Sequence, residues 1–246
     1  MFISHSHEDK EIAMKIKAEL EEHGLRSFVA HEDIEPSKEW AKEIVKVARS
    51  CRIFIYLLSE NFYNSGSRWP DHEIGMGVFG NSLCIPLSMD DKIPYGALAH
   101  IQKAKIDEEG YYKRKLVVLS GKTSIELPQF IFSKWYQEEK EEALSYLISA
   151  LKDVKDFHTG NRICVLLADI DNKNQLTYKE ASAIISSGLS NEQVFNPKYS
   201  TSSRTFIEAL TEKHSQSLDK ELVRKVRGNA LKTEDGALPN PNSQDN

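Results

Sequence analysis

Two side chains that could take part in chemistry stand four residues apart in the stretch SRWPDHEIGMG, residues 67–77. If this stretch is helical, Trp69 and Glu73 lie on the same face, because residues at i and i+4 are neighbours on a helix surface. A carboxylate can accept hydrogen bonds from hydroxyl groups and stabilise a developing positive charge, and an indole offers a flat surface to an aromatic base. The spacing therefore fits a site for a ligand that carries both an aromatic base and a group that develops positive charge.

The same stretch also suits an ordinary helix start. Pro70 is favoured in the first turn, and acids such as Asp71 and Glu73 complement the helix dipole there. On this interpretation Glu73 is a solvated acid and Trp69 a partly buried packing residue. The dipole is expected to keep the Glu73 carboxyl ionised in either case.

Alternating strands and helices must position this stretch. The run CRIFIYLLS is apolar at nearly every position, which is typical of a central parallel strand covered on both faces. Three amphipathic helices are predicted. The first follows Asp9, which can cap it, and ends at Gly24. The second begins at about Trp40, and the third covers the closing segment EEKEEALSYLISALKDV. This α/β alternation predicts a parallel sheet with a ligand crevice at the carboxyl ends of its strands. The other predicted strands are MFIS, LRSFVA, SLCIPLS and IQKAKI.

The remaining segments define the expected domains. The β-like segment KLVVLSGKTSIELPQFIFSKWY is additional to the alternation and is predicted to be an edge hairpin or an insertion. Beyond it, ICVLLA is predicted to be a buried strand, and stretches near 201–215 and 218–232 to be helical. The tail TEDGALPNPNSQDN is polar and predicted to be disordered. We therefore expect one domain over 1–157, a small mostly helical carboxy-terminal domain over 158–232 and a tail over 233–246.

Three segments together resemble the TIR (Toll/interleukin-1 receptor) domain family. They are FISHSHEDKEIA, FVAHEDIEPSKEWAKEI and SENFYNSGSRWPDHEIG, in the family's order and spacing, and the resemblance covers roughly residues 1–155. It implies a flavodoxin-like fold. Many bacterial and plant TIR domains, and an animal axonal relative, cleave NAD⁺ through a glutamate in the helix after the third strand. The residue that matches it is Glu73, and Trp69 matches a tryptophan that lines the site in bacterial members.

The resemblance also implies which loops bind the dinucleotide. In related enzymes the loops after the first and second strands flank it, which makes Ser4, His5, Ser6, His31 and Ile34 candidate substrate-binding residues. Ordinary loop polarity is the alternative interpretation for each of them. The second loop often carries a glycine after its proline, and Ser37 stands there in this chain, so the conformation of that loop is an open point.

NAD⁺ cleavage could proceed with a single carboxylate. The nicotinamide nitrogen is already cationic and leaves as a neutral ring, whereas ordinary glycosidases flank their bond with two carboxylates. The expected products are nicotinamide and either ADP-ribose or a cyclic ADP-ribose, with NAD⁺ as substrate and no cofactor. The resemblance further implies a homo-oligomer formed through TIR–TIR contacts and a role in bacterial antiphage defence.

Two other functions are compatible with the sequence. The first is a TIR domain that acts only as a self-associating adaptor. The second is a carboxy-terminal sensor of an unknown activator, a nucleic acid or a phage protein, because residues 198–232 carry eight Lys or Arg against four Asp or Glu. The formal net charge of −5 argues against a uniformly basic nucleic-acid binder.

Two motifs imitate metal sites. His5, His7 and Asp9 follow the dinuclear motif of metallo-β-lactamase-like hydrolases, but Lys10 replaces the last histidine. The segment DIDNKNQLTYKE, residues 169–180, imitates an EF-hand loop, but a lysine replaces its fifth ligand. A turn followed by a capping box of Thr177 and Glu180 explains this segment better, and no metal is expected.

Cysteine usage and hydropathy indicate the compartment. Cys51, Cys84 and Cys164 form neither a CxxC pair nor a cluster with histidines, so neither a disulfide framework nor a zinc site is expected. The sequence shows no apolar run of about 18 residues and no secretory leader. We therefore expect a cytoplasmic protein with no membrane association.

Overall fold

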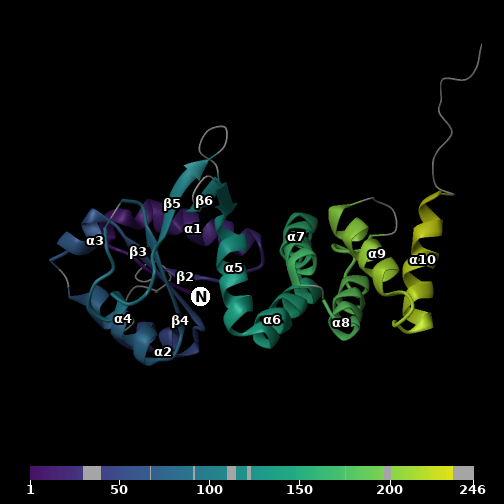
Figure 1. The fold of residues 1–246 in the computed structure, drawn as a ribbon, viewed down its shortest axis with the longest axis horizontal. Coiled ribbons are helices and arrows are strands. Elements are labelled where there is room, and N and C mark those ends of the chain that lie inside the picture. Colours follow the sequence, from purple (N-terminus) through teal and green to yellow (C-terminus); the bar gives the residue numbers. More distant parts are fainter. Residues whose placement is uncertain are drawn as a thin grey trace, which may run out of the picture. The chain divides into compact units, whose positions relative to one another are not determined.

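A computed structural model shows the arrangement of the chain (Figure 1). The chain divides into two compact units, Met1–Ala143 and Leu144–Asn246, which are described separately below. The domain boundary expected at residue 157 stays a prediction. The structure describes residues 1–29, 40–66, 68–90, 92–109, 115–120, 123–174, 176–196 and 201–234.

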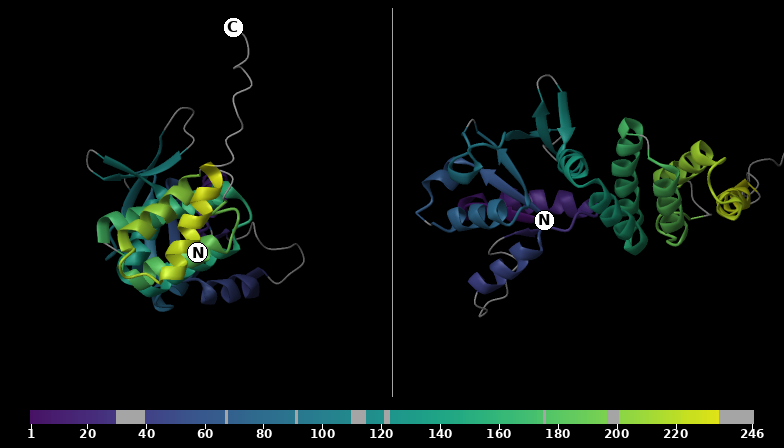
Figure 2. Two further views of the ribbon diagram at one scale, coloured as in Figure 1. Left: turned by 90° about the vertical axis from the view of Figure 1, so that its right-hand side faces the viewer. Right: turned by 60° about the horizontal axis from the view of Figure 1, so that its bottom comes forward.

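Seven strands form one sheet within the described residues of the first unit, in the order β2-β1-β3-β4-β5-β6-β7. Neighbouring strands from β2 to β5 run parallel, whereas β6 and β7 are antiparallel additions at the edge. In Figures 1 and 2 the β5 and β6 strands extend beyond the rest of the sheet. The predicted flavodoxin-like parallel sheet, followed by a helical carboxy-terminal region, is confirmed. The strands are β1 (Phe2–Ser4), β2 (Phe28–Val29), β3 (Ile53–Leu58), β4 (Leu83–Ser88), β5 (Ala104–Glu109), β6 (Lys115–Ser120) and β7 (Thr123–Glu126).

The central strand β3 is buried along its whole length, as its apolar run predicts. Its alternate residues Phe54, Tyr56 and Leu58 join one hydrophobic cluster with Ile44 of α2 (Trp40–Ser50) and Ile74 of α4 (Trp69–Phe79). Because successive side chains of a strand point to opposite faces, the intervening residues of β3 are buried on the other face. Helices therefore cover the sheet on both sides, as parallel sheets require.

The helices of the first unit connect these strands. Helices α2 and α4 contact each other and lie together in Figure 1, and α1 contacts α5. After α1 the chain turns at Gly24, whose φ of 74° is in the left-handed region that favours glycine. The elements are η1 (His7–Asp9), α1 (Lys10–Glu22), α2 (Trp40–Ser50), α3 (Glu60–Asn64), α4 (Trp69–Phe79), η2 (Gly96–Leu98) and α5 (Leu127–Glu138).

Two local predictions in this unit need correction. Asp9 precedes α1, but its side chain makes no capping hydrogen bond to that helix. The β-like segment after residue 114 does contain the predicted edge hairpin, β6 and β7, but its second half is the helix α5. Pro128 stands in the first turn of α5, and Ile131 and Trp135 are buried at helical spacing, so the apolar residues there follow a helical period.

Within its described residues, the second unit contains helices joined by loops and no strand. The run ICVLLA, predicted to be a strand, lies within α7, so that prediction is wrong. The buried residues Ile163, Leu167 and Ile170 recur every three to four positions, while Val165 is exposed, which is the pattern of an amphipathic helix. The helices are α6 (Lys140–Asp153), which contains the division between the units, α7 (Phe157–Asn174), α8 (Tyr178–Leu189), α9 (Ser202–His214) and α10 (Lys220–Glu234).

The predicted capping box at the start of α8 is confirmed. The Thr177 hydroxyl accepts a hydrogen bond from the Glu180 amide, and the Glu180 carboxylate accepts one from the Thr177 amide. Among the described residues, no helix is long and apolar enough to span a membrane. Of the tail predicted to be disordered, residues 235–246 lie outside the described part of the chain.

Candidate active site

A cleft of about 410 Å³ opens at the carboxyl ends of the parallel strands in the first unit. In the strand order 2-1-3-4-5 the direction of winding reverses between β1 and β3, and open α/β sheets bind their ligands at such a switch point. The volume is in the range of small-molecule pockets. The cleft is lined by the loop after β1 and by the segment that leads into α4, through His5, Ser6, His7, Glu8, Ser65, Gly66, Trp69 and Pro70.

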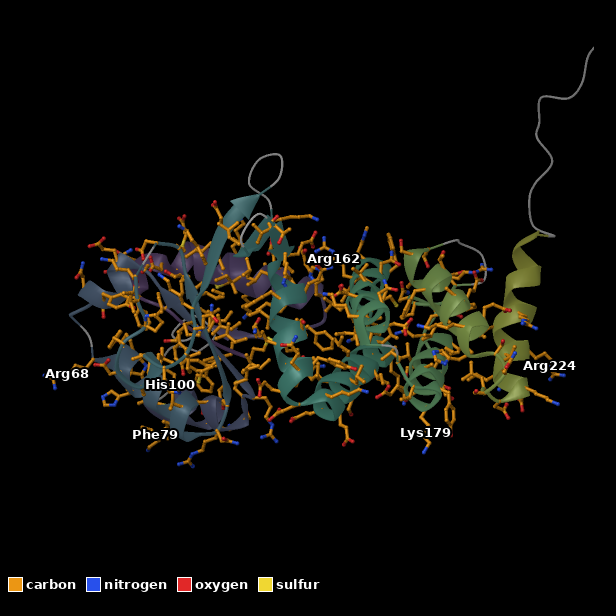
Figure 3. The ribbon with its side chains drawn as sticks, viewed as in Figure 1. Arg68, Phe79, His100, Arg162, Lys179 and Arg224 are labelled. Atoms are coloured by element: carbon orange, nitrogen blue, oxygen red, sulfur yellow. The ribbon has the colours of Figure 1, made fainter. Side chains whose placement is uncertain are left out.

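Glu73 lies next to this cleft but not on its surface. Its side chain is only 1% exposed, and the Ser4 hydroxyl donates a hydrogen bond of 2.5 Å to its Oε2 atom. Among the described residues no lysine or arginine forms an ion pair with it. Helix α4 directs Glu73 inward, whereas Phe79 at the end of the helix points into solvent (Figure 3). Glu73 is therefore not the solvated first-turn acid of the alternative interpretation.

Burial controls the ionisation of Glu73. Desolvation, the largest cause, raises the pKa of its carboxyl to about 7, and the hydrogen-bond donors Ser4 and Trp69 lower it by less. The prediction that the helix dipole keeps this carboxyl ionised is therefore wrong. The dipole acts mainly on the first turn, and Glu73 lies beyond it in a desolvated position. Near neutral pH both protonation states are populated.

Trp69 connects the carboxyl to the cleft. It is the first residue of α4 and lines the cleft, and the interaction of its side chain with Glu73 lowers the pKa of that carboxyl. The second oxygen of Glu73, Oε1, completes no hydrogen bond of ordinary geometry with any described residue. Trp69 and Glu73 thus share one side of α4.

The other predicted substrate-binding residues fall into three groups. His5 and Ser6 line the cleft, with exposures of 7% and 3%. Ser4 is fully buried and donates to Glu73, so it lies behind the cleft in this structure. His31 and Ile34 lie outside the described residues. The structure therefore brings together the candidates from the first strand and from α4.

A tyrosine that the sequence analysis did not single out fixes the position of Glu73. The Tyr56 hydroxyl donates a hydrogen bond of 3.2 Å to the backbone carbonyl of Glu73, and burial raises the pKa of Tyr56, so its proton is retained. A Cβ atom on Gly77 would lie 2.1 Å from that hydroxyl. A side chain at position 77 would therefore push α4 away from β3. The repeated glycine of IGMG was the available signal for this contact.

Asp9 was also missed as a member of the site. The Ser6 and Ser59 hydroxyls both donate hydrogen bonds to its Oδ2 atom, the former at 2.5 Å, and the Asn61 amide donates one of 2.8 Å to Oδ1. Asp9 itself is 9% exposed. Two of its donors are about fifty residues away in the sequence, so no local pattern could have indicated them.

In both metal-like motifs the acidic side chains form hydrogen bonds or ion pairs with other residues of the protein. Asp9 holds the three donors described above. In the imitation EF-hand loop, both carboxylate oxygens of Asp171 accept hydrogen bonds from the Lys213 ammonium, and Lys173 pairs with Asp169. The described residues contain no group of three or more His, Cys, Asp or Glu side chains that could hold a metal ion.

The strand order and the position of the cleft define a flavodoxin-like α/β domain with a cleft at its switch point. Comparison with protein families identifies this domain more closely: residues 1–117 match the model of the TIR domain, so this part of the chain is a TIR domain. None of the curated proteins and none of the solved structures compared with the chain matches it.

Proposed function

We propose that the protein cleaves the nicotinamide–ribose bond of NAD⁺. The observation that carries the proposal is the position of Glu73, a buried carboxyl that forms no ion pair with a cation in the described part of the chain and is connected through Trp69 to a cleft at the switch point. A carboxylate in so dry an environment interacts strongly with any positive charge placed beside it. NAD⁺ cleavage creates such a charge on the ribose.

The proposed reaction uses the ionised form of Glu73. Nicotinamide departs as a neutral ring with the bonding electron pair, and the carboxylate stabilises the oxocarbenium-like ribose that remains. The indole of Trp69 offers its face to an aromatic base and moves aside far enough for Oε1 to reach the ribose. Water then attacks the anomeric carbon to give ADP-ribose, or an atom of the same molecule attacks it to give a cyclic product, which gains from proximity.

The cleft supplies groups for the rest of the substrate. His5 and Ser6 line it and can donate hydrogen bonds to phosphate or ribose, while Ser4 orients the carboxyl from behind. NAD⁺ is the substrate, and the proposal includes no cofactor. TIR domains generally self-associate, and we expect a homo-oligomer formed through TIR–TIR contacts. A role in antiphage defence remains part of this proposal.

Separation of products by chromatography after incubation with NAD⁺ tests the proposal. Wild-type protein at high concentration should release nicotinamide together with ADP-ribose or its cyclic form. Glu73→Ala should lose about a hundredfold or more in rate, the usual cost of removing one electrostatic stabiliser. Glu11→Ala removes an exposed acid of α1 and serves as the control. Turnover that persists in Glu73→Ala would exclude Glu73 from the reaction, and wild-type protein without turnover would favour the adaptor function.

A feature of the second unit supports a second candidate function. A hollow of about 560 Å³ beside α10 is lined by three cations, Lys220, Arg224 and Arg227, and by no acid among the residues that the structure describes. Arg227 pairs with Glu212 across an exposed contact, and Arg224 points into solvent (Figure 3). Clustered cations of this kind suit the phosphate groups of a nucleic acid, so we propose that this unit recognises one.

Binding of the full-length protein to a nucleic acid can be measured by gel shift at several salt concentrations. Arg224→Glu should weaken binding and reduce its salt dependence, because each phosphate contact contributes to the salt slope. Lys179→Glu makes the same charge change on the exposed surface of α8 (Figure 3) and serves as the control. Equal effects of the two substitutions would show that the hollow has no special role.

A further inference from the structure

The carboxyl group of Asp9 joins three segments at the carboxyl end of the sheet. One of its oxygens accepts hydrogen bonds from the Ser6 and Ser59 hydroxyls, and the other accepts one from the Asn61 amide. All three donors are neutral groups. Asp9 is buried, and it does not cap the helix that follows it. Its contacts are therefore directed across the molecule instead of along its own helix.

These donors belong to the two sides of the cleft. Ser6 lies in the loop after β1, which forms one wall. Ser59 follows β3 and caps α3, and Asn61 lies within α3, whose end leads directly into Ser65 and Gly66 of the other wall. A single carboxyl group is thus hydrogen-bonded to both walls.

Ser59 links Asp9 to the start of helix α3. Its hydroxyl donates to Asp9 and at the same time accepts a hydrogen bond of 3.0 Å from the Phe62 amide. The direction of the hydroxyl proton is fixed by the first bond, which leaves the oxygen lone pairs oriented towards the amide. Loss of Asp9 would therefore loosen the start of α3 as well as the loop that carries Ser6.

We infer that Asp9 is a positioning residue that sets the separation of the two walls of the cleft. A carboxylate accepts at both oxygens, whereas asparagine accepts at one and presents donor protons at the other. Asparagine has nearly the same shape but cannot hold the three donors together. This inference rests on the proposed function only where it concerns NAD⁺, because the geometry of the walls can be measured without a substrate.

Hydrogen exchange of the full-length protein tests the geometry. In Asp9→Asn the amides of position 9, Phe62 and Tyr63, which bond to Ser6 and Ser59 in the wild type, should exchange at least tenfold faster than in the wild type. The amides of β3 should keep their rates. Asp71→Asn is the matched control, because it makes the same change at an exposed acid that accepts one hydrogen bond, from a tyrosine hydroxyl.

Asn61→Ala is a second test variant, which keeps the inference testable if Asp9→Asn fails to fold. Asn61 is exposed apart from its bond to Asp9, so its removal should leave the fold intact and should speed exchange in α3 alone. Unchanged exchange at both walls in Asp9→Asn would overturn the inference. Faster exchange spread evenly over β3 and α5 would also overturn it, because Asp9 would then stabilise the whole fold instead of the walls.

Steady-state kinetics with NAD⁺ are the second test of the role of Asp9. Asp9→Asn should raise KM at least tenfold and change kcat less than threefold, because the walls position the substrate while Glu73 keeps its own contacts. A fall in kcat with unchanged KM would contradict a positioning role. If the wild type does not turn over NAD⁺, the proposed function fails, whereas the exchange experiment still decides the role of Asp9.

Discussion

Replacing Glu73 by glutamine should make the unfolding of the first unit respond differently to pH. The carboxyl is 1% exposed, and its pKa is raised from an ordinary value of 4.5 to about 7, with burial as the largest cause. Between these values the unfolded state loses its proton before the folded state does. The contribution of the protonated Glu73 carboxyl to wild-type stability is therefore fully present below pH 4.5 and is lost as the pH rises through 7. Glutamine cannot ionise and lacks this dependence.

The size of the effect follows from the two pKa values. Linkage between them predicts that the free energy of unfolding of Glu73→Gln, relative to wild type, rises by about 2–3 kcal/mol between pH 5 and pH 8. Urea unfolding followed by tryptophan fluorescence measures it. The three tryptophans, Trp40, Trp69 and Trp135, all belong to Met1–Ala143, so their signal reports this unit alone.

Two outcomes would refute the reasoning about Glu73. A difference that does not change between pH 5 and pH 8 would show that the carboxyl does not titrate in this range. A difference that instead changes below pH 5, and falls there as the pH rises, would show that the folded state lowers the pKa, as the helix dipole alone would do. In either case burial would not be the dominant influence on Glu73.

Three further predictions concern the same site. For the wild type, kcat/KM for NAD⁺ should fall about tenfold per pH unit below pH 7, because only the ionised form of Glu73 is active; a flat profile would contradict this. Ser4→Ala removes a donor that lowers the pKa of Glu73, so the midpoint of that profile should move to higher pH, and a downward shift would count against the assigned contact. Gly77→Ala should lose about 1–3 kcal/mol in urea unfolding through its clash with Tyr56. Gly75→Ala, where an added Cβ meets only one side-chain atom at 3.9 Å, should change stability by about 1 kcal/mol or less, and equal losses would refute the role of the clash.

Much of the sheet could be predicted from the sequence because its strands are short apolar runs bounded by polar loops. The run Ile53–Leu58 is apolar at every position, which is typical of a strand covered on both faces. The six-residue run ICVLLA was misassigned for a related reason. A short apolar run does not distinguish a buried strand from a buried turn of helix, and here the residues around it continue a helical period.

The sequence predicted which residues of the site share a face but not how deep they lie. The i, i+4 spacing places Trp69 and Glu73 together, yet it does not show whether that face looks towards solvent or towards the sheet. The depth depends on Tyr56 and Gly77, whose contact brings α4 close to β3. The role of Asp9 depends likewise on partners that are distant in the sequence. Local patterns carry no information about such contacts.

The rate of nicotinamide release from NAD⁺ at pH 8, compared between wild type and Glu73→Gln, tests the central claim most directly. At this pH the wild-type carboxyl is mostly ionised, and glutamine preserves its size while removing its charge. The account predicts release by the wild type and a loss of about a hundredfold or more in the variant. Equal rates in the two proteins would contradict it.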